Sequence, residues 1–268
     1  MTNPQIRVGI GGWSYEGWRG SFYPAGLPKT RELKYAAARL TAIEVNGTFY
    51  SSFKPETFAG WARAAPDGFK FAIKASRYCV TRRVLAEAGE SVERFLGQGL
   101  TELGDKLGPI LWQFADTRRF DPDDMAAFLR LLPASRDGVK LRHAIQGRHE
   151  SFVTPEFVRL AREAGVAIVF ADSATRPALA DVTADFVYAR LENGVVEEPA
   201  GYSPTALDRW AATARVWAGG GRPGDLPYAD GEAAPERPRD VFVFFIAGAK
   251  ERAPHGATAL IERLGGGR

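Results

Sequence analysis

Short β-rich segments alternate with longer helix-like segments eight times along this 268-residue chain. The expected strands cover residues 6–12, 42–46, 69–75, 109–115, 139–143, 166–172, 185–191 and 240–248. The expected helices cover residues 31–40, 55–65, 88–103, 121–132, 154–165, 177–181, 203–218 and 256–265. This alternation predicts a parallel sheet covered by helices. An open doubly wound sheet and a closed (β/α)8 barrel both satisfy it, and eight units in this length favour a single-domain TIM-type barrel over residues 1–268.

One connection is unusually long. Residues 219–239 are rich in glycine and proline and show no periodicity. Loops beyond about 12–15 residues are usually functional or mobile. Because this segment runs from a helix to a strand, a barrel places it on the N-terminal face, opposite the usual active site. We expect a mobile insertion there.

Composition narrows the class of protein. A net charge of +3 gives no strong field for nucleic acid or membranes, and 45% hydrophobic residues are typical of a globular chain with a sizeable core. The N-terminus lacks the pattern of a signal peptide, and no apolar stretch approaches the roughly 18 residues of a membrane span. Cys79 is the only cysteine, so no internal disulfide can form. These features favour the cytoplasm and no membrane partner; they do not indicate an oligomeric state.

Polar side chains occur where several of the expected strands end. In a barrel, alternate strand residues point inward, and those at the C-terminal ends line the mouth. The candidates are Glu44, Asn46, Lys74, Gln113, Arg142, Asp172 and Arg190. A ligand site at the mouth explains such a set, and so does a purely architectural polar rim with ion pairs. For Glu44 we expect an inward position and an ion pair with Lys74, Arg142 or Arg190, Lys74 being the nearest.

The residue types indicate a chemistry. Lys74, Arg142 and Arg190 are cations suited to a carboxylate or phosphate, and Asn46 and Gln113 could orient a ligand by hydrogen bonds. Glu44 and Asp172 could act as acid, base or arginine partner. The catalytic candidates are therefore Glu44, Lys74 and Asp172, and the binding candidates are Asn46, Gln113, Arg142 and Arg190. Lys74 could be a nucleophile if its pKa fell, although an anion-binding role is favoured.

Metal and cofactor signals are weak. The three histidines have no zinc-type spacing, and we predict no metal and no cofactor. Magnesium held by Glu44 and Asp172 stays open, because oxygen ligands leave little sequence signature. His143 could be a base, but if Arg142 points inward, His143 faces the helices and is structural.

The N-terminal segment GIGGWSYEGWRGSFYP (9–24) is strongly aromatic. Trp13, Tyr15 and Trp18 fall in the first strand-to-helix loop. They could form a packed cover over the rim or a stacking platform for a planar ligand, and both can hold at once. Trp13 and Tyr15 are the binding candidates. The glycines lack the last member of G-x-G-x-x-G, so dinucleotide binding is not indicated.

Several motifs together resemble those of a known family. They are GWSYEGWRGSFYP, IEVNGTFYSSFKPETFAGW, FKFAIKASRYCVTRR, LGDKLGPILWQF and ADFVYARLE, in order from about Arg7 to about Leu264. On these motifs the chain is similar to the domain-of-unknown-function-72, or YecE-like, family. The resemblance implies a TIM-type barrel but no established activity, and proposals of nucleic-acid binding for the family rest on likeness to endonuclease-type barrels.

The chain departs from that family's common pattern at several strand ends. Lys140 stands where a glutamate is usual, Glu192-Asn193 replaces His-Gly, and Ile246-Ala247 replaces two asparagines. These losses indicate a divergent subgroup. The candidates Glu44, Asn46, Lys74, Gln113, Arg142 and Arg190 are retained.

Three functions fit these observations. The first is an enzyme, or a diverged enzyme, that handles an anionic small molecule at the mouth. The second is a nucleic-acid binder or nuclease, with aromatic stacking at Trp13, Tyr15 and Trp18 and phosphate contacts from Arg77, Arg82, Arg83, Arg118 and Arg119. The third is a scaffold without catalysis.

Overall fold

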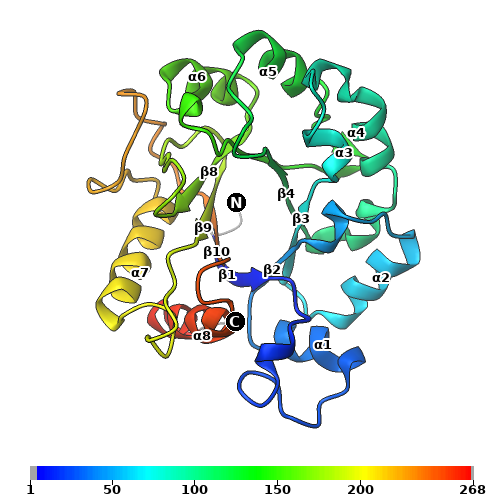
Figure 1. Ribbon diagram of the computed structural model, residues 1–268, viewed down its shortest axis with the longest axis vertical. Helices are drawn as coiled ribbons and strands as arrows, with labels where there is room; N and C mark the ends of the chain where they lie inside the picture. Colours follow the sequence, from blue (N-terminus) through cyan, green and yellow to red (C-terminus); the bar gives the residue numbers. More distant parts are fainter. Residues whose placement is uncertain (1–4, 267–268) are drawn as a thin grey trace.

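The computed structural model describes residues 5–266, so the outermost residues of the predicted domain, 1–4 and 267–268, lie outside it. Eight parallel strands form a closed barrel (Figure 1). In spatial order they are β1 (Ile6–Gly11), β2 (Ala42–Val45), β3 (Lys70–Lys74), β4 (Leu107–Gln113), β7 (His143–Gln146), β8 (Ala167–Asp172), β9 (Phe186–Leu191) and β10 (Asp240–Phe245). The predicted TIM-type barrel is confirmed.

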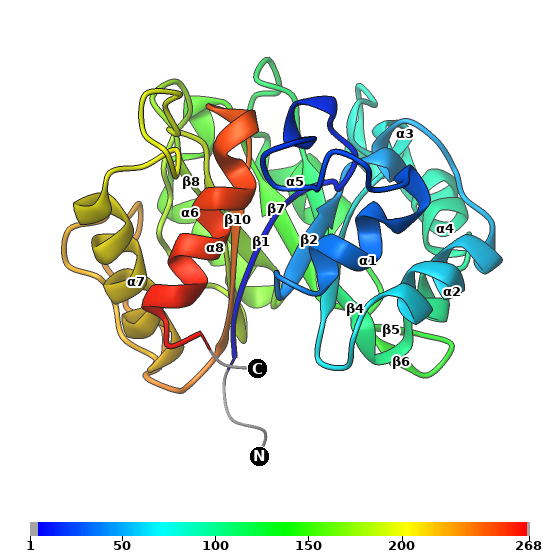
Figure 2. The same cartoon turned by 90° about the horizontal axis from the view of Figure 1, so that it is seen from below.

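Helices surround the barrel, and the strand-to-helix loops lie together at the upper side in Figure 2. The helices are α1 (Glu32–Ala37), α2 (Pro55–Ala64), α3 (Arg77–Val80), α4 (Gly89–Leu96), α5 (Pro122–Leu129), α6 (Pro155–Glu163), α7 (Pro204–Ala218) and α8 (Ala253–Arg263). Asp121, Thr154 and Ser203 cap α5, α6 and α7 by accepting a backbone N–H, each just before a proline at the first helical position. The helix expected at 177–181 does not form.

Alternation along each strand separates two cores. Outward residues such as Ile43 and Ile145 pack against the helices, whereas the inward layer combines small residues with aromatic ones. Ala42, Ala72 and Ala144 leave room inside the barrel for large rings such as Tyr188 and Phe242. Gly9 is required by close approach, because a Cβ there would lie 2.0 Å from the Ala42 carbonyl oxygen. The barrel interior is therefore filled, and a ligand site has to lie at its rim.

The expected fifth strand, residues 139–143, is wrong by several residues. Val139–Lys140 forms β6, which pairs antiparallel with β5 (Ser135–Arg136). The two-residue turn between them is Asp137-Gly138, with φ of 49° and 76°. Positive φ at both positions is the geometry of a type I′ hairpin, for which Asp-Gly is a favoured sequence. The barrel strand is β7, which begins only at His143.

The long connection at residues 219–239 packs beside α6 on the N-terminal side, where it is the orange loop of Figure 1. The Asp181 carboxylate accepts the backbone N–H groups of Ala229 and Asp230 at 2.8 and 3.0 Å. Arg162 of α6 pairs with Asp230 at 2.9 Å. Several fixed contacts thus hold this loop, and its mobility stays a prediction.

Among residues 5–266, the helices include none long and apolar enough to cross a bilayer.

Candidate functional site

A buried ion pair occupies the C-terminal mouth of the barrel. Glu44, near the end of β2, has no exposed surface, and Arg190 of β9 is 3% exposed. Arg190 Nε lies 3.1 Å from Glu44 Oε2, and Arg190 Nη2 lies 3.2 Å from Glu44 Oε1. Tyr188 donates a further hydrogen bond to Glu44 Oε2 at 2.7 Å. The predicted inward position of Glu44 is confirmed.

The partner of Glu44 is not the one expected to be nearest. Lys74 is on the adjacent strand, yet Arg190 reaches Glu44 across β10 and β1. The late inward positions of β1 are Gly9 and Gly11, so no side chain of that strand intervenes. A bidentate guanidinium also satisfies both carboxylate oxygens, which one ammonium cannot do.

Glu44 is held as a carboxylate. Burial alone would raise its pKa, but the charges of Arg190 and Lys74 and the hydrogen bond from Tyr188 bring the pKa below its ordinary value. Burial alone would lower the pKa of Arg190, but the negative charge of Glu44 raises it above its ordinary value. Glu44 is thus a fixed negative charge that orients Arg190, and it is a poor proton donor near neutral pH.

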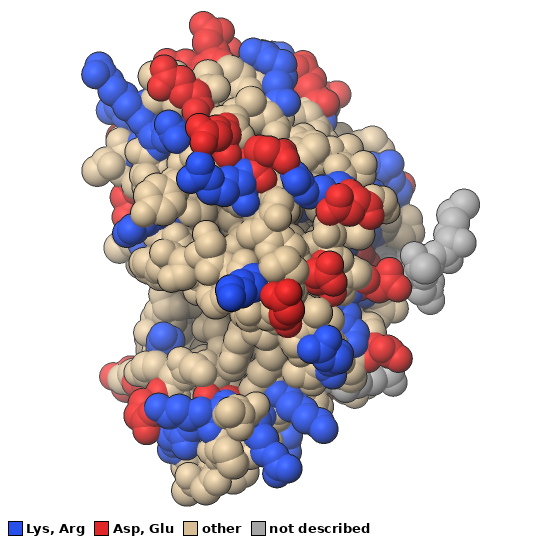
Figure 3. Space-filling view, turned by 90° about the vertical axis from the view of Figure 1, so that its right-hand side faces the viewer, with Lys and Arg blue, Asp and Glu red and all other residues tan. Residues whose placement is uncertain are grey.

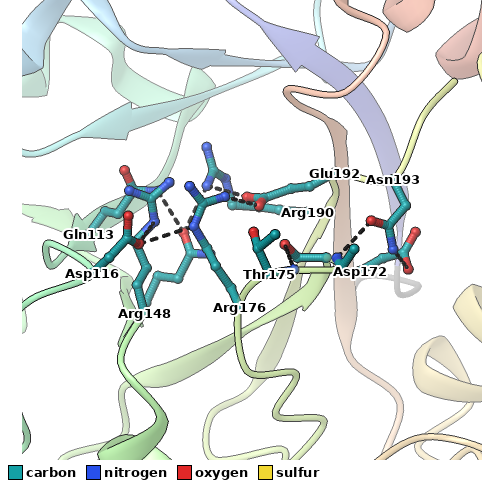
Figure 4. A network of polar contacts seen from close by, with 12 residues as sticks. Gln113, Asp116, Arg148, Asp172, Thr175, Arg176, Arg190, Glu192 and Asn193 are labelled. Carbon is teal, nitrogen blue, oxygen red and sulfur yellow. Dashed lines mark hydrogen bonds and ion pairs between the residues drawn. The ribbon is translucent and has the colours of Figure 1, made fainter. Parts of the chain in front are cut away.

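A chain of alternating charges continues from Arg190 toward the surface (Figure 4). Arg190 also contacts Glu192 at 2.7 Å, and Glu192 contacts Arg176 at 2.7 Å. Arg176 then pairs with Asp116 at 3.2 Å, and Asp116 with Arg148 at 3.5 Å. Three carboxylates, Glu44, Glu192 and Asp116, therefore alternate with three arginines, Arg190, Arg176 and Arg148.

Lys74 is a fourth cation at this mouth. It ends β3, and its Nζ lies 4.6 Å from the centre of the Phe49 ring. It has no ion-pair partner among the residues that the structure describes. Burial lowers its pKa to about 8, with Glu44 opposing this and Arg190 and Arg148 adding to it. Since the other six charges balance, the Lys74 proton is the net positive charge of the cluster.

Two further donors at the mouth lack an acceptor in residues 5–266. Gln146, the last residue of β7, accepts from Gln113 Nε2 at 2.6 Å and from Arg190 Nη1 at 2.8 Å. These two donors fix the Gln146 amide, because a flipped amide would face them with its own N–H groups. Gln146 Nε2 is then a buried donor without a partner. Arg148 Nε also makes no hydrogen bond, although it lies 3.5 Å from Asp116 Oδ1, the ion-pair contact given above. Together with Lys74, the mouth holds three donor groups that make no hydrogen bond within the described residues.

The other predicted mouth residues are Asn46 and Gln113. Asn46 donates to Glu44 Oε1 at 3.1 Å and is partly exposed at the rim. Gln113 is buried and donates to Gln146 as described above. Both therefore lie beside the charged network, as expected from the period of their strands.

The predicted inward position of Asp172 is wrong. Ala167 and Val169 face the interior of the barrel, which places Asp172 on the helix-facing side of β8. Its carboxylate accepts hydrogen bonds from Asn193 Nδ2 at 2.8 Å and Tyr202 Oη at 2.9 Å. Figure 4 shows Asp172 and Asn193 to one side of the arginine cluster. Asp172 anchors a loop and, with Glu44 inside the barrel, cannot share a magnesium ion.

The predicted position of Arg142 is also wrong. Because β7 begins at His143, Arg142 precedes the strand and lies at the N-terminal end of the barrel. There it pairs with Asp240 at 2.9 Å and lies over the rings of Phe186 and Phe242. His143 faces the helices, where it is hydrogen-bonded to Trp112 and to the Pro133 carbonyl group. The structural interpretation of His143 is confirmed.

Most of the aromatic N-terminal segment is a packed cover. Trp18 is buried and donates to the Lys250 carbonyl at 2.8 Å, and Tyr23 donates to that of Trp13 at 2.6 Å. Trp13 and Tyr15 are partly exposed and contact Trp61 and Trp18 edge-on. These two rings stay available at the rim, whereas Trp18 is not available for stacking.

Several residues of the network were missed. Tyr188 and Glu192 share the period of Arg190: Tyr188 lies within the expected strand 185–191, and Glu192 lies one residue beyond its end. Gln146 and Arg148 were not identified, because the fifth strand was expected to end at residue 143 and both residues lie after that point. Asp116 and Arg176 lie in loops and carry no periodic signal.

No group of three or more His, Cys, Asp or Glu side chains within residues 5–266 could hold a metal ion.

Comparisons with known proteins agree with this architecture. A family described as "Protein of unknown function DUF72" matches residues 7–268. The UPF0759 protein YecE of Escherichia coli K12 is 28% identical over 142 residues, which is 52% of this chain and 48% of that protein. The chain thus matches about half the length of this curated relative.

Solved structures of low sequence identity share the fold. A DUF72 family protein from Thermotoga maritima superposes with a TM-score of 0.74 at 22% identity, covering 97% of this chain and 98% of that one. One from Enterococcus faecalis gives 0.68 at 20% identity, with coverages of 97% and 98%. SacUVDE gives 0.55 at 9% identity, with the same coverages. The solved structures agree in fold, and the match of the family model to residues 7–268 shows that the chain belongs to the DUF72 family of proteins of unknown function.

Proposed function

We propose that the protein is an enzyme, or a diverged enzyme, that binds an anionic small molecule at the barrel mouth. The observation that carries this proposal is the set of three donors that make no hydrogen bond within residues 5–266: Lys74 Nζ, which contacts the Phe49 ring, the buried Gln146 Nε2, and Arg148 Nε, which lies 3.5 Å from Asp116. A buried donor left unpaired costs about 1–3 kcal/mol, and more if it is charged. A carboxylate or phosphate group at the mouth would supply acceptors for such donors.

The charge of the site supports an anion. Three carboxylates offset three arginines, and the protonated Lys74 leaves one positive charge over. A monoanion would bring the cluster to neutrality. The Glu44–Arg190 pair would hold the geometry, since its members are already bonded to each other and to Tyr188 and Glu192. Trp13 and Tyr15 would contact the body of the ligand at the rim.

A role for Lys74 in catalysis follows from its lowered pKa. With a pKa of about 8, a useful fraction of the amine is free of its proton near neutral pH. Such an amine can take a proton from a substrate or attack a carbonyl carbon when the anionic group of that substrate does not lie directly against Lys74, because such a contact would raise its pKa. Glu44, whose pKa is lowered, would stabilise the protonated form of Lys74 instead of donating a proton itself.

The experiment is a thermal-shift screen of carboxylated and phosphorylated metabolites at constant ionic strength. At least one anion should raise the melting temperature of the wild type and fail to do so for Lys74→Met and Arg148→Met. Arg94→Met, on an exposed pair of α4, is the matched control and should respond like the wild type. If no anion stabilises the wild type beyond sodium chloride, the proposal is wrong.

A second candidate function is nucleic-acid binding beside the mouth. A groove of about 1170 Å³ between the loops that follow β3 and β4 is lined by Arg83, Arg118 and Arg119. Three aspartates, Asp121, Asp123 and Asp124, line it as well, and Arg118 pairs with Asp124 at 3.5 Å.

The surface charge in view disfavours a continuous phosphate track. Figure 3 shows basic and acidic side chains intermingled over much of the face that carries α2 and α4. Phosphate contacts predict an affinity for single-stranded DNA or RNA that falls steeply between about 50 and 200 mM salt. An affinity that does not change with salt would contradict this second function.

A further inference from the structure

A second cavity, of about 510 Å³, lies on the N-terminal side of the molecule, away from the mouth. It is bounded by the C-terminal ends of α5 and α6, by the β5–β6 hairpin and by the last residues of the 219–239 loop. Its walls are largely apolar and include Leu132, Leu141, Val166 and Val182. Small-molecule sites typically measure about 300–1,000 Å³ and combine such walls with a few polar groups.

The unusual residue of this cavity is Arg239, which is only 3% exposed. Its Nη2 donates to the Pro235 carbonyl at 2.7 Å, but its Nε is buried without an acceptor. Among the described residues it has no carboxylate partner. Burial and the neighbouring Arg237 lower its pKa. An arginine is seldom fully buried unless it is paired, so a missing counter-ion is the simplest explanation for this one.

Of the other lysine and arginine side chains that line the cavity, three are already paired and the fourth, Arg237, is exposed to solvent. Lys140 contacts Asp185 at 2.8 Å, and Arg142 contacts Asp240 at 2.9 Å. Arg162 is held by Asp230 of the long loop. Arg239 is therefore the buried cation of this cavity that a ligand would neutralise, and the apolar walls would receive the rest of the ligand.

We propose that this cavity binds a monocarboxylate with an apolar body, whose carboxylate accepts hydrogen bonds from Arg239. A hydrocarbon chain would lie against the leucine and valine walls, and the 234–239 segment would close over it. The site is separate from the mouth, because Arg239 directly precedes β10 at the opposite end of the barrel. It also gives the long loop a function, since residues 234–239 form one wall of the cavity.

The test uses octanoate as the probe, with octanol and octylammonium as the neutral and cationic analogues. Calorimetric titration is done on Lys74→Met protein, so that the amine of the mouth does not contribute. Octanoate should bind to one site and the two analogues about tenfold more weakly or not at all. Arg239→Met should reduce octanoate affinity about tenfold or more, whereas Arg94→Met should leave it unchanged. Equal binding of octanol, or full affinity in Arg239→Met, would overturn the proposal.

A second measurement covers the case in which Arg239→Met fails to fold. Hydrogen exchange of the Lys74→Met protein, which keeps Arg239, is followed with and without octanoate. Octanoate should slow exchange in residues 232–239 and leave the aromatic segment at 9–24 unchanged. Protection of the mouth loops without protection of residues 232–239 would show that octanoate binds elsewhere, and the proposed site would be wrong.

Discussion

Both ends of this barrel hold arginines in ion pairs, but the arginines are paired differently at the two ends. At the mouth, Arg190 is shared between two carboxylates, Glu44 and Glu192. At the N-terminal end one carboxylate, Asp240, serves two arginines, at 2.9 Å from Arg142 and 3.5 Å from Arg7. Arg142 and Arg190 look alike in the sequence, since each is the second-to-last residue of an expected strand. The comparison shows that an arginine near the end of an expected strand does not by itself mark a site.

The largest expected effect concerns the carboxylate that anchors the mouth. Glu44→Ala leaves Arg190 with one carboxylate in a buried place, and breaking such a pair typically costs about 3–5 kcal/mol of unfolding free energy. Denaturant unfolding measures it. Asp240→Ala, at the more exposed N-terminal pair, should cost less, and Glu90→Ala on an exposed pair of α4 should be near neutral. Equal losses for Glu44 and Asp240 would remove the distinction between the two ends.

The next effect concerns ligand affinity and not stability. Lys74→Met removes the surplus cation, and loss of a charged hydrogen bond of about 1.5–3 kcal/mol weakens anion binding roughly ten- to hundredfold. The unfolding free energy should stay the same or rise, because a partly buried, unpaired charge is removed. Titration of the best anion of the screen measures the affinity, and Lys34→Met on the exposed side of α1 is the control. Unchanged affinity in Lys74→Met would place the anion elsewhere.

A substitution at the N-terminal end of the barrel should have a smaller effect on stability and none on anion binding at the mouth. Arg142→Met removes the ion pair with Asp240, which is only partly buried, and should cost about 1–2 kcal/mol of unfolding free energy. Anion affinity at the mouth should not change, because Arg142 lies at the other end of the barrel. A tenfold loss of that affinity would mean that the two ends are coupled.

The pH dependence of the unfolding free energy tests whether Glu44 is ionised in the folded protein. The pKa of Glu44 is lowered in the folded protein, so the unfolded state binds this proton more readily. The stabilisation is therefore present above the ordinary glutamate pKa of 4.5 and is lost as the pH falls below it. Denaturant unfolding between about pH 3 and 6 should show this loss in the wild type and a smaller one in Glu44→Gln. An identical acid dependence in both proteins would contradict the ionised state of Glu44.

Much of the fold and part of the site could be predicted from the sequence. Glu44, Lys74, Gln113 and Arg190 were placed correctly because each falls in a strand whose apolar period is clear. Asp172 was misplaced because Ala171 is the last residue of β8 that faces the barrel interior. Asp172 follows it directly, and neighbouring residues of a strand point to opposite faces.

Other residues could not be placed by periodicity. The run Val139 to His143 alternates like a strand, and only the Asp137-Gly138 turn signals that its start belongs to a hairpin. Arg176 and Asp116 meet because two loops from different strands approach each other, and no local pattern encodes that approach. The cavity around Arg239 likewise depends on how the 219–239 loop folds back toward α6.

The central claim is that Lys74 carries the unbalanced charge of the mouth. The most direct measurement is an NMR titration of the Lys74 side chain, assigned by comparison with Lys74→Met. We expect a pKa of about 8 in the free protein, against an ordinary value of 10.5, and a rise when a saturating anion is added. Anion affinity should correspondingly fall as the pH rises through 8. A pKa of about 10.5 that no anion changes would contradict the account.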